Sequence, residues 1–97
     1  MDDEPVRLPI DGILDLHTFR PRDACNVVDE YIRECLEKRI YRVRIIHGKG
    51  IGTLRETMRR HLAKNPSVAG FSSAMPEEGG WGATIAILHR PEQEKKK

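Results

Sequence analysis

Six residues that include three glycines are the first feature that suggests chemistry: His47-Gly48-Lys49-Gly50-Ile51-Gly52, here called the glycine loop. Glycines permit positive φ angles and let a ligand approach the backbone amides closely. If a helix follows the loop, the positive end of that helix and the loop amides together form an anion site. We therefore expect a phosphate-binding loop, in which the participating residues are Gly48, Lys49, Gly50 and Gly52.

Basic residues follow the glycine loop. Between Lys49 and Lys64 the sequence has five basic residues and one acidic residue. We expect Arg55 and Arg59 to extend the phosphate site toward a nucleic-acid partner. The alternative interpretation is a tight turn that only joins a strand to a helix. The spacing is neither G-x-x-x-x-G-K-[ST] nor G-x-G-x-x-G, so a nucleotide cofactor is not indicated.

Polar residues also alternate with leucines near the start of the chain, in Leu14-Asp15-Leu16-His17. Side chains alternate along a strand, so Asp15 and His17 would share a face. A carboxylate among apolar neighbours needs a partner, which could be the loop amides, His17 or a divalent ion. Imidazoles titrate near neutral pH and can move protons during phosphodiester cleavage. We expect His17 and His47 to face the bound phosphate; the alternative is that both are neutral, hydrogen-bonded residues at strand ends.

Three further features bear on chemistry. Asp15, His17 and His47 could ligate zinc or manganese by type, but no H-x-x-x-H or cysteine cluster accompanies them. No metal ligand is therefore assigned, and a divalent cation such as magnesium or manganese stays an open question as a cofactor. Trp81 lies in a glycine-rich turn, where it could stack on an exposed base or lie against its own surface. His61 is expected to be a packed or capping residue of a helix.

The pattern of apolar residues predicts six elements that must position these side chains. Apolar residues recur at helical spacing in two segments and follow strand-like patterns in four others. In chain order the expected elements are a strand at Ile10–His17, a helix over Ala24–Leu36, a strand at Tyr41–Ile46, a helix from Gly52 or Thr53 to about Lys64, and strands at Val68–Met75 and Gly82–His89.

This order of elements predicts an α/β fold. Two right-handed crossovers make the first three strands parallel, and the fourth strand joins them antiparallel. Two helices can cover only one side of the resulting sheet, which gives a two-layer sandwich with a mixed four-stranded sheet and both helices on one face. Ligands collect at the carboxyl ends of parallel strands. We therefore expect the end of the first strand and the glycine loop to lie side by side.

Length and composition limit the kind of protein. The 97 residues suffice for one domain with a modest core, and 38% hydrophobic with 33% charged residues suits a folded chain. We expect one domain at 10–90 between flexible tails at 1–9 and 91–97. No apolar run approaches the roughly 18 residues of a membrane span, and the acidic start lacks the features of a signal peptide. We therefore expect a cytoplasmic protein with no membrane partner, whose two cysteines are reduced.

Three motifs resemble the Smr (small MutS-related) family. Leu14-Asp15-Leu16-His17 is similar to the family's LDxH motif, the segment Ile46–Arg55 to HGKGxGxLR, and Gly79–Thr84 to GGxGAT. The motifs occur in the family's order and span the chain from about Ile10 to His89. One departure is Thr18, because many members have a glycine directly after the LDxH histidine.

The resemblance implies a β-α-β-α-β-β sandwich, similar to the C-terminal domain of translation initiation factor three, and a stand-alone member of the family. It also implies an endonuclease that nicks DNA or cleaves RNA, in DNA repair or recombination or in RNA and ribosome quality control. The alternatives are a non-catalytic module that binds nucleic acid or the ribosome and, third, a small-molecule phosphate hydrolase. The oligomeric state is not predicted. The residues implicated in the family map here onto Asp15, His17, His47, Gly48 and Gly50.

Overall fold

Strands and helices follow one another in the expected order in the computed structural model, which describes residues 10–50 and 52–91. The strands are β1 (Ile13–Asp15), β2 (Arg42–Ile46), β3 (Val68–Ser73) and β4 (Ala83–Leu88), and the two α-helices are α1 (Ala24–Glu37) and α2 (Thr53–Lys64). Short 3-10 helices are η1 (Pro21–Asp23), η2 (Pro76–Glu78) and η3 (Gly80–Gly82). Apart from residue 91, the predicted tails lie outside the described residues.

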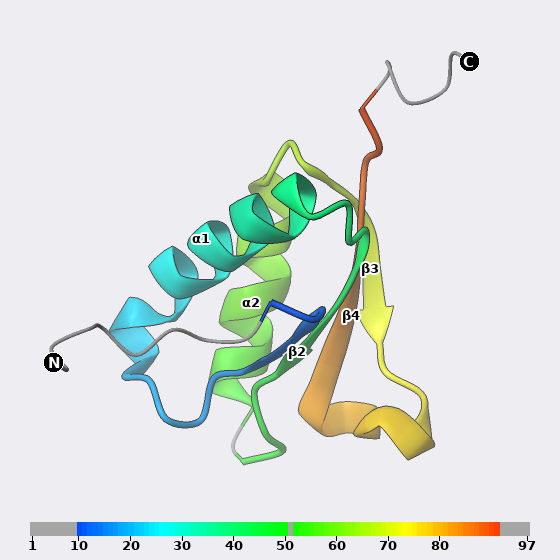
Figure 1. Cartoon of the computed structure of the whole chain (residues 1–97). Coiled ribbons are helices and arrows are strands. Elements are labelled where there is room, and N and C mark those ends of the chain that lie inside the picture. The colour runs from blue at the N-terminus through cyan, green and yellow to red at the C-terminus, as the bar shows by residue number, and fades with distance from the viewer. Residues whose placement is uncertain (1–9, 51, 92–97) are drawn as a thin grey trace, which may run out of the picture.

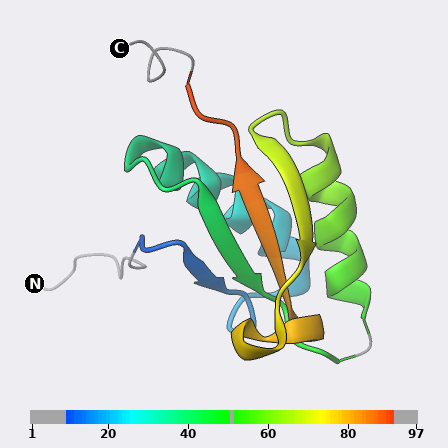
Figure 2. The same cartoon turned by 90° about the vertical axis from the view of Figure 1, so that its right-hand side faces the viewer.

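The four strands form one mixed sheet in the order β1-β2-β4-β3. β1 and β2 are parallel, and β4 is antiparallel to both β2 and β3. The first three strands are therefore parallel to one another, as predicted, and β4 lies between β2 and β3. Figure 2 shows the consequence: β1 and β2 end at the same edge of the sheet at which β4 begins.

The first strand is shorter than the sequence predicts. The strand comprises only Ile13–Asp15, although the predicted strand ran from Ile10 to His17. The amides of Asp11 and Gly12 instead donate to the Tyr31 hydroxyl on α1, at 3.2 and 3.0 Å, and Gly12 has a φ of +93°. The strand therefore starts at Ile13, directly after the two residues whose amides bind the Tyr31 hydroxyl.

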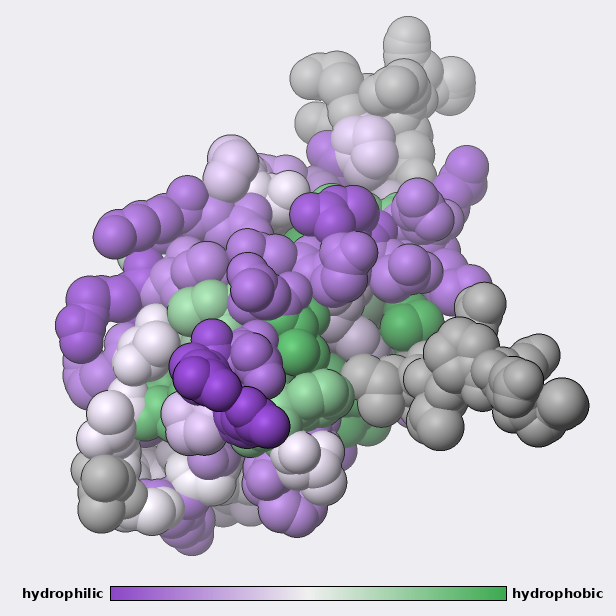
Figure 3. Space-filling view, turned by 90° about the vertical axis from the view of Figure 1, so that its left-hand side faces the viewer, coloured by the Kyte–Doolittle hydropathy of each residue, from purple (hydrophilic) through white to green (hydrophobic). Residues whose placement is uncertain are grey.

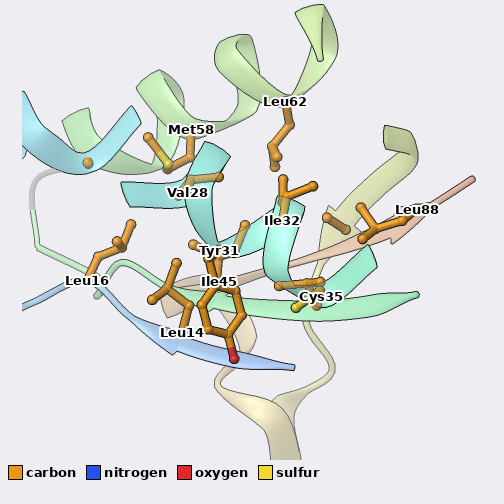
Figure 4. Close-up of a cluster of buried hydrophobic side chains, with 13 residues drawn as sticks. Leu14, Leu16, Val28, Tyr31, Ile32, Cys35, Ile45, Met58, Leu62 and Leu88 are labelled. Atoms are coloured by element: carbon orange, nitrogen blue, oxygen red, sulfur yellow. The ribbon is translucent and has the colours of Figure 1, made fainter. Parts of the chain in front are cut away.

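Both helices lie on one face of the sheet and enclose the core with it (Figure 1). In Figure 4 the labelled side chains of the sheet and of the helices point toward one another. The predicted alternation in β1 and β2 is confirmed, because every second side chain faces the helices. The buried cluster comprises Leu14, Leu16, Ala24, Val28, Tyr31, Ile32, Cys35, Val43, Ile45, Met58, Leu62, Ala86 and Leu88.

The opposite face of the sheet, here called the outer face, has neither helix on it (Figure 2). Its apolar side chains include Ile13 and Ile87, which are exposed. Arg42 at one end of β2 forms an ion pair with Glu78, with Nη2 2.7 Å from Oε1. This ion pair ties the β3–β4 connection to β2.

The surface on the left of Figure 1 is largely hydrophilic, with a smaller apolar area near its centre (Figure 3). A charged exterior agrees with the 33% of charged residues in the sequence. Among the described residues, no helix is both long enough and apolar enough to cross a membrane. Cys25 and Cys35 are both free cysteines, in agreement with the expectation that they are reduced.

Candidate functional site

Three segments that are distant in the sequence meet at the edge of the sheet where β1 and β2 end. The Leu16 amide donates to the Ile46 carbonyl at 2.8 Å, which joins the end of β1 to the end of β2. The amides of His47 and Gly48 both donate to the Gly82 carbonyl, each at 2.9 Å. The expected meeting of the first strand and the glycine loop is therefore confirmed, and the turn before β4 joins them.

The glycine loop depends on two of its glycines for backbone conformation. Gly48 and Gly52 have φ angles of +87° and +86°, which other residues rarely adopt. Gly52 precedes α2, and no side chain caps the amides of the first turn of that helix. Gly50 has no positive φ, and no heavy atom lies within 4 Å of the position of an added Cβ. Since Gly48, Lys49 and Gly50 are all exposed, a ligand can reach this part of the loop.

Gly82 supports the glycine loop from below and leaves no room for a side chain. A Cβ at this position would lie 3.3 Å from Lys49 Cγ and 3.4 Å from the carbonyl carbon of Gly48. Two further glycines of the same turn, Gly79 and Gly80, have positive φ angles of 111° and 51°. Sequence reasoning expected here a connection between two strands, in which Trp81 could stack on a base, and it missed the contact of Gly82 with the loop. The density of glycines in residues 79–82 was the available signal.

Asp15 and His17 form a hydrogen-bonded pair at the end of β1. The His17 amide donates to Asp15 Oδ1 at 3.0 Å, and the ring Nδ1–H donates to the same oxygen at 2.9 Å. The backbone amide of His17, followed by its ring, lowers the pKa of Asp15 below its usual value. The His17 side chain is 72% exposed, and its Nε2 has no hydrogen-bond partner among the described residues. This nitrogen can therefore accept a proton from a ligand or a water molecule.

The environment of Asp15 differs from the one expected. Its side chain is 48% exposed rather than enclosed by apolar neighbours. The reason is the strand pleat, which turns Leu14 and Leu16 into the core and Asp15 outward. Of the three partners considered for Asp15, namely the loop amides, His17 and a divalent ion, the structure shows His17.

His47 is held in the interior, with 7% of its surface exposed. Its Nδ1 lies 3.1 Å from the Gly48 carbonyl, which can only accept, so Nδ1 carries the ring proton. Its Nε2 then accepts a hydrogen bond from the Thr84 hydroxyl at 2.9 Å. Burial is the largest cause that lowers the pKa of His47, the Gly48 carbonyl opposes it, and the charges of Arg55 and Arg59 add to the lowering. The ring is therefore neutral at pH 7.

The rings of His17 and His47 lie on different faces of the sheet. His47 continues the alternation of Val43 and Ile45 toward the helices, whereas His17 shares the outward side of Asp15. The arrangement in which both rings face one phosphate is therefore not found. A direct catalytic part for His47 stays a prediction, and its contacts are those of the alternative, a neutral and hydrogen-bonded residue. Sequence reasoning missed Thr84, whose signal was one hydroxyl in an otherwise apolar strand.

Two arginines of α2 lie over aromatic rings. The Arg55 guanidinium carbon is 4.9 Å from the centre of the Trp81 ring, and Arg55 Nη2 donates to the Ser73 hydroxyl at 3.3 Å. One helical turn later, Arg59 lies 5.3 Å from the centre of the Phe71 ring. Arg55 and Trp81 therefore border the loop, and Arg59 lies one helical turn further along α2, where its charge still acts on His47.

The remaining histidines lie away from the loop. His61 Nε2 is 2.8 Å from Asp29 Oδ1, so it links α2 to α1. His61 is therefore a packed residue, which is the first of the two roles expected for it. His89 follows the far end of β4 and is exposed. In the part of the chain that the structure describes, no group of three or more His, Cys, Asp or Glu side chains could hold a metal ion.

Sequence comparison relates these segments to known proteins. The profile of the Smr domain matches residues 14–89, which include β1, the glycine loop and the turn before β4. Endonuclease MutS2 of Staphylococcus carnosus (strain TM300) is 41% identical over 75 residues, which are 77% of this chain and 10% of that protein. Endonuclease MutS2 of Staphylococcus aureus is 43% identical over the same shares. The chain therefore spans about a tenth of the length of these relatives.

Two solved structures have the same fold. The Smr domain of Thermus thermophilus MutS2 superimposes with a TM-score of 0.77 and 33% identity, covering 81% of this chain and 99% of that one. YdaL, a stand-alone small MutS-related protein from Escherichia coli, has a TM-score of 0.76 and 27% identity, covering 81% of this chain and 65% of that one. The chain belongs to the Smr domain family.

Proposed function

We propose that this chain binds nucleic acid at the glycine loop and cleaves a phosphodiester bond, as an endonuclease. The observation that carries the proposal is the Asp15–His17 pair, whose exposed imidazole lies at the same sheet edge as an exposed loop of glycines and Lys49. The relatives named Endonuclease MutS2 support it, because they are 41% and 43% identical to 77% of this chain, and the Smr domain match at residues 14–89 includes all three segments of the site. Both DNA and RNA are candidate substrates.

In the proposed reaction, the loop amides and Lys49 hold the phosphate and stabilise the negative charge that grows on its oxygens. His17 Nε2 removes a proton from a water molecule as the water oxygen bonds to phosphorus. The bond from phosphorus to the leaving oxygen then breaks, that oxygen takes up a proton from solvent water, and the His17 imidazolium returns its own proton to solvent. Asp15 fixes the ring through Nδ1–H and stabilises the imidazolium form, since its lowered pKa keeps it ionised at neutral pH.

His47 has a positioning part in this proposal. Its ring joins the Gly48 carbonyl to the Thr84 hydroxyl, so it holds the loop against β4. A divalent cation such as magnesium or manganese could assist at Asp15, which supplies an exposed carboxylate. A setting in DNA repair or in RNA and ribosome quality control belongs to the same proposal.

The test is cleavage of end-labelled single-stranded, duplex and branched DNA and RNA, each with magnesium, with manganese and with EDTA. We expect His17→Ala to lower kcat about 100- to 10,000-fold, which is the usual contribution of a general base, and Asp15→Asn to lower it less. His89→Ala is the matched control, because it removes an exposed histidine at the far end of β4. Equal cleavage by the wild type and His17→Ala would identify a contaminating nuclease.

Binding without cleavage would favour the alternative, a module that recognises nucleic acid or a ribosomal surface. In that case every substrate would bind in a salt-dependent manner and remain intact under all metal conditions. The proposal of an endonuclease would then be wrong, and that of a nucleic-acid site would stand.

A further inference from the structure

We infer that Trp81 is a stacking platform for an unpaired base, so that this site selects a phosphate next to a single-stranded or flipped-out nucleotide. The inference rests on the proposed function, because it names the class of substrate for the same loop. It concerns a side chain that the phosphate chemistry does not require.

The position of Trp81 beside the loop is the first support. Trp81 directly precedes Gly82, and the Gly82 carbonyl accepts the amides of His47 and Gly48. The Gly82 backbone lies against Lys49, with 3.3 Å between an added Cβ and Lys49 Cγ. Adjacent Cα atoms are about 3.8 Å apart, so the indole side chain is attached one residue before the backbone that supports the glycine loop. A base attached to a phosphate in the loop is therefore within reach of the ring.

The exposure of Trp81 is the second support. The side chain is 58% exposed, and neither buried cluster of the fold includes it. The glycines around it have structural reasons, which are positive φ angles at Gly79 and Gly80 and the close contact at Gly82. Core packing gives no comparable reason for a large aromatic ring at position 81. We therefore expect a bound ligand to cover this ring.

The contact with Arg55 is the third support. The Arg55 guanidinium lies 4.9 Å from the ring centre and is anchored by Ser73, at 3.3 Å from its hydroxyl. The guanidinium covers part of the indole, and an exposed fraction of 58% requires that a large part of the ring remain open. Arg55 thus fixes the ring and adds a positive charge next to it. An aromatic ring beside cations is the combination by which proteins bind single strands.

A stacking platform of this kind favours unpaired bases over bases in a duplex. A base inside a duplex is stacked on both sides and paired at its edge, so it offers no free face to an indole. An unpaired or flipped base does offer one, at little or no cost of unpairing. Truncation of one stacking side chain lowers single-strand affinity by roughly 5- to 150-fold. The same truncation should leave duplex affinity unchanged.

Trp81 is the only tryptophan in the chain, so its fluorescence reports on the ring itself. The probes are a mixed-sequence single-stranded oligonucleotide, as DNA and as RNA, its duplex, and single strands with one abasic position at each site in turn. We expect quenching by the single strands and little quenching by the duplex. One abasic position, next to the bound phosphate, should abolish most of the quenching.

Variants test the same point through affinity. Trp81→Ala should lose roughly 5- to 150-fold in affinity for the intact single strand and lose nothing further on the abasic one, while Trp81→Phe should keep most of the affinity. Met75→Ala is the matched control, because Met75 is also 58% exposed and lies in the same connection. Equal losses by Trp81→Ala on single strand and duplex, or a loss that the abasic position does not remove, would overturn the inference.

The outcome for this inference is separable from the outcome for catalysis. Quenching that depends on one base, in a protein that cuts no substrate, would support stacking and contradict the endonuclease. Cleavage that depends on His17 but ignores both Trp81→Ala and the abasic position would do the reverse.

Discussion

Individual residues at the sheet edge are held in two different ways. Asp15 and His17 bind each other and stay exposed, so their chemistry is available to a ligand. His47 is enclosed between Gly48 and Thr84, so its contribution comes through the position of the loop. The two kinds of residue should respond differently to pH and to substitution.

The buried imidazole of His47 should make stability depend on pH. Its pKa in the folded protein is lowered by burial, whereas in the unfolded chain a histidine titrates near about 6.5. Below about pH 6.5 the unfolded chain therefore binds the additional proton, and the free energy of unfolding falls as the pH falls toward the folded pKa. We expect this loss in urea denaturation of the wild type between pH 7.5 and 5. His47→Gln should lack this component, and a difference between the two proteins that does not change with pH would contradict the assignment.

Three glycines of the site should respond differently to alanine. Gly48→Ala places a side chain at a φ of +87° and should lower the free energy of unfolding by about 1–2 kcal/mol. Gly82→Ala should push the loop away, because its Cβ would lie 3.3 Å from Lys49 Cγ. Gly50→Ala is the control for folding, since nothing lies within 4 Å of its Cβ. Urea denaturation and nucleic-acid binding, measured on all three, separate these effects. Weaker binding by Gly50→Ala at unchanged stability would show that the ligand approaches the backbone at that position.

At the scale of elements, the position of the Asp15–His17 pair depends on a strand of only three residues. β1 is fixed to α1 through the buried hydroxyl of Tyr31. This hydroxyl accepts hydrogen bonds from the amides of Asp11 and Gly12, and it donates one to the Ile13 carbonyl at 3.1 Å. Tyr31→Phe keeps the ring and leaves these backbone groups without their partner.

We expect Tyr31→Phe to lower the free energy of unfolding by about 1–3 kcal/mol, because buried donors lose their acceptor. Cleavage and binding should also weaken, since β1 positions His17. Urea denaturation and the cleavage assay measure the two effects. An unchanged free energy of unfolding would show that water replaces the hydroxyl at no cost.

The elements that the sequence predicted best are those with a clear period. The helical spacing of Val28, Ile32 and Cys35 corresponds to buried positions of α1, and Leu14 and Leu16 alternate into the core as expected. The start of β1 was predicted too early, because the amides that Tyr31 binds leave no mark on the apolar pattern. The place of β4 between β2 and β3 was also not predicted, since spatial strand order depends on packing between distant segments.

The meeting of the segments of the candidate site was predicted from the sequence, whereas most of the contacts between them were not. The motifs at 14–17 and 47–52 do meet at one sheet edge. The direction of the His47 ring was missed, because it depends on which face of β2 the helices cover and on Thr84, which lies 37 residues away in the chain. The support that Gly82 gives to the loop was missed for the same reason, as it is a contact between distant segments.

At the scale of the whole molecule, the net charge of +2 is too small to drive binding to nucleic acid. If the proposed function is correct, affinity for nucleic acid comes from the local group of cations around the glycine loop. Removal of one phosphate-binding cation should reduce the slope of log affinity against log salt by about 0.7 for single strands and about 0.9 for duplex.

We expect Lys49→Ala to reduce this slope by the value for one phosphate contact and to weaken binding to all sequences equally. Lys64→Ala is the matched control, because Lys64 is exposed at the opposite end of α2. The measurement is fluorescence anisotropy with labelled oligonucleotides from 50 to 300 mM salt. Equal slopes for Lys49→Ala and the wild type would mean that the ligand lies elsewhere.

The central place of β4 in the sheet affects how the protein folds during its synthesis. β4 pairs with β2 on one side and β3 on the other, yet it follows both along the chain. While the polypeptide is being synthesised, β2 and β3 have no common neighbour, and the carbonyl of Gly82 and the hydroxyl of Thr84 are not yet there to receive His47 and Gly48. A growing chain therefore has no assembled site, and the proposed nucleic-acid site can form only after β4 has paired with β2.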